Sequence, residues 1–292
     1  MDVSLDQILT ALDGAWRLAP IFALFLGVGF LAQLVDGALG MAYGVVSSTV
    51  LLSFGVPPAQ ASAIIHAAET ATTGVSGASH LLHRNIDWTL FLRLAPAGII
   101  GGVLGAYVLT GMDETLMKAV VVAYLGVLGL LILRRAFRPL EDREPHLKRV
   151  IPLGVAGGFL DASGGGGWGP IVTSTLLGRG HAPRYAIGTV NTTEFLVTVA
   201  ISATFLWAAA TGRFELPHGF QGAGAALAGL VLGGVFAAPF AGLITKMAPP
   251  RVMFGAVGVL VTVLALWQGV QVWPRFIANP TVVQLTALVA PS

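Results

Sequence analysis

The chain contains no cysteine and little charge. Without cysteine it forms no disulfide, uses no thiolate in catalysis and holds no cysteine-ligated metal. Only 10% of its 292 residues are charged and 55% are hydrophobic, which excludes an ordinary soluble globular protein. Long stretches have no Asp, Glu, Lys or Arg: 94–112, 119–133, 216–245 and 252–274. Because a membrane-spanning helix needs about 20 apolar residues, the sequence predicts an all-α integral membrane protein embedded in the lipid bilayer.

The few charges are placed as a membrane protein places them. The formal net charge of +2 comes from Lys and Arg gathered in loops, so it indicates no nucleic-acid partner. The first 17 residues carry acidic side chains ahead of the first apolar run, so we expect no cleavable signal peptide. Their apolar residues follow helical spacing, which predicts an amphipathic segment, 1–17, on the membrane surface.

The chain contains an internal repeat. Residues 29–78 align without a gap onto 154–203, at an offset of 125 residues. Two acidic residues in each copy support the repeat: Asp36 and Glu69 are 33 residues apart, and so are Asp161 and Glu194. The sequence therefore predicts two related halves, 18–134 and 150–273, joined by a basic linker, 135–149, and followed by a tail, 274–292.

Each half is predicted to contain five segments. A first apolar stretch ends in a Gly-rich break, DGALGMAYG or DASGGGGWG, and a short second stretch and a proline-containing turn follow. The stretches beside the second break, of about 11 and 8 residues, are too short to cross a bilayer. We therefore expect a re-entrant or broken helical hairpin in each half, with tips at 37–44 and 162–169. Three longer helices complete each half: 59–82, 90–110 and 115–134, then 185–210, 218–244 and 251–272.

The basic residues predict the orientation. Loops near 83–93, 178–184 and 245–251 fall on the same side as the linker 135–149, and these regions hold most of the Lys and Arg. Basic loops face the cytoplasm, so we expect the linker there and both termini on the opposite side of a bacterial inner membrane. Three crossings in each half insert the second half upside down. Such inverted repeats are typical of secondary transporters, with the solute site at the midplane. An intramembrane enzyme using His66 and Glu69 would need a nucleophile or a metal set, and the sequence has no Cys and no additional clustered ligands, so we expect no enzyme.

The Gly-rich tips are the first candidate solute site. Gly40, Gly165 and Gly166 let the backbone approach a ligand, and the helix after each tip directs its N–H groups inward, as small-anion binding requires. The alternative is that these glycines serve only close helix packing. Tyr43 and Trp168 occupy equivalent places at the tips, where they line the site, gate it or simply pack.

Polar runs on the third segment of each half are the second candidate. His66 with Glu69, and Asn191 and Thr192 with Glu194, lie on helices where positions three apart share a face. We expect Glu69 and Glu194 to bind and release a proton during transport. The alternative is that each stays protonated and hydrogen-bonds to backbone groups left open at a break. His66 is a proton carrier, a solute donor or a packed neutral side chain. An HxxE pair supplies only two ligands, so we expect no metal site and no cofactor.

Asp36 and Asp161 begin the two breaks. An Asp at such a place caps the following helix through its N–H groups, which is the structural interpretation. Coupling to an ion or a proton is the alternative, and the sequence leaves both open.

At these residues the chain resembles the TauE/SafE family of sulfite exporters. The resemblance rests on the two Gly-rich segments with their acids, the Asn/His-x-x-Glu helices, the basic linker and the total length, and it covers residues 18–273. It implies export of a small anion, such as sulfite or an organosulfonate. A carboxylate would repel an anion, so either Glu69 and Glu194 are protonated when the anion binds, which indicates proton coupling and is the hypothesis that we prefer, or they lie away from it. The alternatives are a transporter of a cation or other small solute, or a passive channel; the oligomeric state is open.

Overall fold

The computed structural model describes residues 5–137, 149–213, 215, 222–247 and 250–279, and it contains no strand within them. The all-α prediction is therefore confirmed for this part of the chain. Among the described residues, five helices are long and apolar enough to cross a membrane, and they contain the stretches Arg17–Gly37, Trp88–Leu109, Glu114–Ala136, Pro183–Ala210 and Phe254–Ile277.

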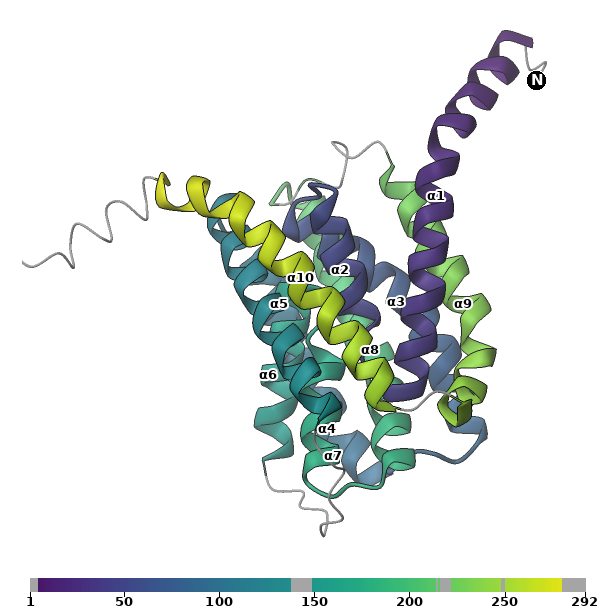
Figure 1. Cartoon of the computed structure of the whole chain (residues 1–292), viewed down its shortest axis with the longest axis vertical. Coiled ribbons are helices and arrows are strands. Elements are labelled where there is room, and N and C mark those ends of the chain that lie inside the picture. Colours follow the sequence, from purple (N-terminus) through teal and green to yellow (C-terminus); the bar gives the residue numbers. More distant parts are fainter. Residues whose placement is uncertain (1–4, 138–148, 214, 216–221, 248–249, 280–292) are drawn as a thin grey trace, which may run out of the picture.

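The helices follow the predicted order (Figure 1). The first half contains α1 (Leu5–Leu39), α2 (Tyr43–Ser53), α3 (Pro58–Leu82), α4 (Trp88–Leu109) and α5 (Glu114–Ala136). The second half contains α6 (Val150–Gly164), the π-helical turn η1 (Gly169–Thr173), α7 (Ser174–Gly178), α8 (Pro183–Ala210), α9 (Ala223–Met247) and α10 (Pro250–Ile277). Helices α3 and α8 both begin with a proline at their first turn, where the missing N–H costs no hydrogen bond.

Several predicted boundaries differ from the structure. Helix α1 is continuous from Leu5, so from that residue the predicted segment 1–17 forms the first turns of α1 and no separate element. Helix α6 has 15 residues, more than expected, because the helix continues past Asp161 to Gly164. It is about 22 Å long at 1.5 Å per residue, still shorter than a hydrocarbon core of about 30 Å.

The ends of three predicted segments fall partly outside the described residues. Most of the linker 135–149 and of the tail 274–292 lies there, as do the first residues of the predicted helix 218–244. Helix α10 continues to Ile277, a few residues into the predicted tail.

The two helix interruptions lie inside the predicted tips, at residues 40–42 and 165–167. Gly40 has a φ of 65° and Gly165 a φ of 68°, a left-handed conformation that glycine adopts without steric cost. Each of these glycines donates its N–H to the carbonyl four residues earlier, of Asp36 at 2.5 Å and of Asp161 at 2.7 Å. The two repeats therefore end their first helix in the same way.

The helices of one half pack mainly on those of the other. The most extensive contacts join α1 with α9, α4 with α6, α5 with α10, and α3 with α8. Glycines allow this approach: a Cβ on Gly29 of α1 would lie 2.5 Å from the Leu230 carbonyl of α9, and one on Gly101 of α4 would lie 2.1 Å from the Val155 carbonyl of α6. Because α1 and α6 open the halves and α4 and α9 are their fourth predicted segments, the same pairing occurs twice with the halves exchanged.

Candidate functional site

The two Gly-rich tips meet each other in the interior. A Cβ on Gly44 would lie 2.7 Å from the Gly165 carbonyl and 2.8 Å from Glu69 Oε1. Thr173 of η1 donates its hydroxyl to the Gly40 carbonyl at 2.7 Å. The tips, predicted from separate halves, thus form one site together with α3.

Most of the predicted site side chains are sealed from solvent. Exposure is 6% or less for Asp36, Tyr43, His66, Glu69, Asp161, Trp168, Asn191 and Glu194. The conformation is therefore closed around these groups. Thr192 is half-buried and differs from the rest: its hydroxyl donates to the Gly188 carbonyl of its own helix, and its Cα lies against Gly77 of α3. The structure places Thr192 in the α3–α8 contact and not at the tips.

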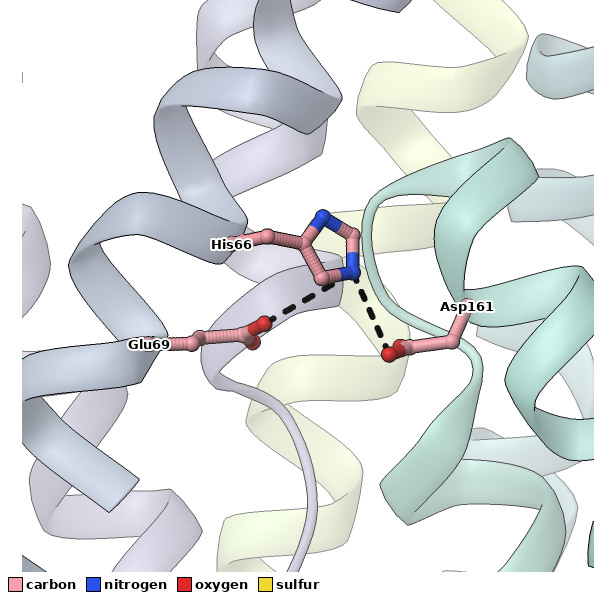
Figure 2. A group of neighbouring side chains, drawn as sticks. All are labelled: His66, Glu69 and Asp161. Atoms are coloured by element: carbon pink, nitrogen blue, oxygen red, sulfur yellow. Dashed lines mark hydrogen bonds and ion pairs between the residues drawn. The ribbon is translucent and has the colours of Figure 1, made fainter. Parts of the chain in front are cut away.

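His66 lies between two carboxyl groups (Figure 2). Its Nε2 atom is 3.2 Å from Asp161 Oδ2, which comes from α6, and 3.9 Å from Glu69 Oε2 on its own helix. On the other side of the ring, Nδ1 lies 2.7 Å from the Ser62 carbonyl oxygen. A carbonyl only accepts, so Nδ1 carries a hydrogen; when the ring is neutral, Nε2 presents its lone pair to the carboxyl groups. We call these three residues, His66, Glu69 and Asp161, the histidine cluster.

Asp161 connects the histidine cluster to the second tip. While Oδ2 faces His66, Oδ1 accepts hydrogen bonds from Gly167 N at 2.7 Å and Trp168 N at 2.9 Å. Asp36 accepts from the backbone N–H of Tyr43, which stands at the equivalent place in the first tip. From the sequence we expected the backbone N–H groups at the tips to bind an anion. In this conformation they donate hydrogen bonds to carboxyl groups of the protein itself.

The equivalent place in the second half has no histidine. Asn191 of α8 accepts from Ser76 Oγ at 3.4 Å and donates to the Ile187 carbonyl at 3.2 Å. Glu194 is buried, and the carboxyl group of Asp36 is close enough to interact with it electrostatically. We call Asn191, Glu194 and Asp36 the asparagine cluster; it contains two carboxyl groups and no base.

Comparison with known proteins identifies the family. Residues 25–274 match the family described as "Sulfite exporter TauE/SafE", a range that contains both tips and both clusters.

The chain belongs to the TauE/SafE family.

The chain is also 41% identical, over 241 residues, to a protein of Bacillus subtilis (strain 168) described as "Probable membrane transporter protein YtnM". That match covers 80% of this chain and 78% of the relative. No solved structure matches the chain. As a TauE/SafE protein with five apolar helices of spanning length, the chain is a multi-pass membrane transporter.

In this TauE/SafE protein the aromatic residues of the tips contact the opposite half. Trp168 is fully buried, donates Nε1–H to the Val190 carbonyl at 3.3 Å and packs on Gly98, where a Cβ would lie 2.4 Å from the indole ring. Tyr43 donates its hydroxyl to the Leu230 carbonyl at 2.9 Å and lies beside Gly234 of α9. The sequence did not indicate these glycine partners, because they lie in apolar helices without a distinguishing motif.

Further groups of the site were also missed from the sequence. Ser48 donates to the Gly164 carbonyl at 2.7 Å and Ser62 to the Ala162 carbonyl at 2.6 Å, so two hydroxyls satisfy carbonyls that the end of α6 leaves open. The Tyr124 hydroxyl of α5 is buried without a hydrogen-bond partner and lies against Gly167. A serine-rich stretch at 47–49 was the only available signal.

The structure also changes the ligand count on which the expectation of no metal site was based. That expectation counted two ligands, from the HxxE pair. Asp161 comes from the other half, and one atom from each of His66, Glu69 and Asp161 lies within 4.8 Å of the others. The reason given for excluding a metal therefore does not hold.

Proposed function

We propose that this TauE/SafE protein is a secondary transporter that exports a small oxyanion, sulfite or an organosulfonate, across the bacterial inner membrane. The meeting of the two broken-helix tips around buried polar groups is the observation that supports this best. Broken helices inside a membrane protein are tolerated where they surround a cavity or a ligand. The family description, sulfite exporter, supports the choice of solute class.

An inverted repeat is part of the proposal. In Figure 1, α2 lies toward the end of the molecule that carries the N-terminus, whereas α7, its counterpart in the repeat, lies toward the opposite end. The exchanged pairings of α1 with α9 and of α6 with α4 are what a two-fold relation between halves produces. We assign the basic linker to the cytoplasm and both termini to the other side. Each tip then faces one side of the membrane, as alternating access requires.

Binding of the anion requires protons at the carboxyl groups. Ionised Glu69 and Glu194 would repel an anion at the tips, and a buried charge without a partner is costly. When Asp161 is protonated, its oxygen holds the N–H groups of Gly167 and Trp168 less strongly. The same N–H groups then bind the anion, with the backbone of Gly40, Gly165 and Gly166 closing around it. Protonation and anion binding are coupled in this way.

Transport in proteoliposomes tests the coupling. Vesicles loaded with sulfite or sulfoacetate are placed under an imposed pH gradient, and efflux is measured for the wild type, Glu194→Gln and Glu69→Gln. We expect efflux to depend on the gradient in the wild type and to lose this dependence in both variants. Glu114→Gln is the matched control, since Glu114 is exposed at the start of α5. Transport that is indifferent to the gradient and to Glu194→Gln would contradict proton coupling.

A cation transporter is the second candidate, because the fixed charges of both clusters are carboxyl groups. Thermal stabilisation by sulfite, sulfate, thiosulfate, sulfoacetate, taurine and simple cations separates the two, since a ligand stabilises by RT ln(1 + [L]/Kd). Stabilisation only by cations would favour the second candidate. A passive channel is distinguished by its failure to move the solute against its gradient.

A further inference from the structure

We propose that the histidine cluster binds a divalent transition-metal cation of the Zn²⁺ or Co²⁺ class. The ligand atoms are His66 Nε2, Asp161 Oδ2 and Glu69 Oε2. This inference goes beyond the transport proposal and does not depend on the identity of the solute.

The hydrogen bonding around His66 requires either a proton or a metal cation between Nε2 and Asp161 Oδ2. Nδ1–H is given to the Ser62 carbonyl, so Nε2 presents a lone pair to Asp161 Oδ2 at 3.2 Å, where the carboxylate oxygen also has lone pairs. Two acceptors at this distance need a positive centre between them.

A metal ion satisfies the cluster more completely than a proton. A proton between His66 and Asp161 leaves Glu69 Oε2 alone, and this oxygen is buried and has no hydrogen-bond partner. An unsatisfied buried carboxylate oxygen is unfavourable. When Glu69 and Asp161 are ionised, which is not the protonated state that anion binding requires, one divalent ion contacts all three atoms and balances the two negative charges.

The distances agree with zinc-like coordination. Bonds from zinc to imidazole nitrogen or carboxylate oxygen are about 2.0–2.2 Å, which places tetrahedral ligand atoms roughly 3.4 Å apart. The separations from His66 Nε2 are 3.2 Å to Asp161 and 3.9 Å to Glu69, and all three ligand atoms lie within 4.8 Å of one another, so the Glu69 side chain must move closer to complete the site. A mixed set of one imidazole and two carboxylates favours zinc, cobalt or manganese over the all-oxygen sites of calcium and magnesium.

The ligands are also held as metal ligands usually are. A metal-bound histidine gives its other N–H to a carbonyl or carboxylate, as His66 does to Ser62. Asp161 is fixed through Oδ1 by the N–H groups of Gly167 and Trp168, which leaves Oδ2 directed at the cluster. Three protein ligands leave the fourth position of a tetrahedral ion open.

The experiment measures metal bound to the full chain, purified in detergent without a polyhistidine tag, stripped with chelator and reloaded with Co²⁺. We expect about one Co²⁺ per chain with ligand-field absorption in the wild type, and loss of that equivalent in His66→Asn. The matched control is His83→Asn, because His83 is exposed and its Nδ1 also lies near the carbonyl four residues earlier. It should retain the metal.

Asn191→His builds the same residue set in the second half, with Glu194 and Asp36. A second equivalent of Co²⁺ in this variant supports the proposal. Equal Co²⁺ binding by folded wild type and folded His66→Asn overturns it. If His66→Asn does not fold, Glu69→Gln removes another ligand instead, and Co²⁺ binding by folded Glu69→Gln equal to that of the wild type overturns the proposal. Because no solute enters this assay, its failure leaves the transport proposal intact, and a failed efflux assay leaves the metal count intact.

Discussion

The histidine cluster and the asparagine cluster occupy equivalent places in the two halves, but only the first contains a base. In the first, His66 from one half faces Asp161 from the other at 3.2 Å. In the second, Asn191 bonds to Ser76 and to its own helix, and Glu194 has Asp36 as its main electrostatic neighbour. The acidic residues therefore occupy equivalent positions in both halves, but only in the first half does a histidine lie beside them. We infer that the two tips take up cations or protons with unequal affinity, which gives the two sides of the transporter different properties.

The largest expected effect comes from removing the base. His66→Leu leaves Asp161 Oδ2 and Glu69 Oε2 buried without the imidazole partner, and an unsatisfied buried carboxyl oxygen costs about 1–3 kcal/mol, more when it is charged. Asn191→Leu removes neutral hydrogen bonds and should cost about 1–3 kcal/mol. Thermal unfolding of both variants in the same detergent compares them. Equal losses in Tm would show that the two clusters are energetically alike.

The second comparison concerns the glycines beneath the tip aromatics. Gly98→Ala places a methyl group against Trp168, which is fully buried and has no room to move, so we expect a loss of about 1–3 kcal/mol. Gly234→Ala meets the Thr72 methyl group first and Tyr43 only at 3.2 Å, so the loss should lie at the lower end of that range. Tm values measured side by side test the order. A larger loss in Gly234→Ala would contradict the tighter packing of the second tip.

The smallest effect tests the hydrogen bond of the first tip. Tyr43→Phe removes only the hydroxyl that donates to the Leu230 carbonyl, and a neutral hydrogen bond contributes about 1 kcal/mol. The Tm should fall slightly while the aromatic ring keeps its packing. Ser163→Ala is a suitable reference, because the Ser163 hydroxyl donates to a carbonyl of its own helix, that of Phe159. An identical change in both variants would show that the contact between α2 and α9 adds no stability.

Much of the fold was predictable from the sequence because it depends on local features. Charge-free stretches predicted the long helices, and the spacing of Asp36 and Glu69 against Asp161 and Glu194 predicted that both halves share one plan. The breaks followed from the glycines, two of which adopt the expected left-handed backbone. The length of α6 was underestimated, because nothing in the sequence DASG prevents the helix from continuing to Gly164.

The composition of the site was less predictable because its contacts join residues far apart in the chain. His66 and Asp161 are 95 residues apart, and no spacing rule indicates that they meet. We included Thr192 among the candidate site residues because it follows Asn191 in the sequence. Successive residues on a helix point about 100° apart, however, and Thr192 faces α3. Tyr124 stands alone in an apolar helix, where nothing distinguishes it from a tyrosine that merely packs.

The exchanged pairing of helices also determines the order in which the protein is assembled during synthesis. Helix α6 finds its partner α4 already in the membrane, so the second tip acquires its packing soon after it leaves the ribosome. Helix α1 must wait for α9, which begins roughly 180 residues after α1 ends. At a synthesis rate of about 5–20 residues per second, this delay lasts roughly 10–40 seconds. During that time the face of α1 that carries Gly29 has no α9 to pack against, so the α1–α9 contact forms later than the α4–α6 contact although α1 is made first.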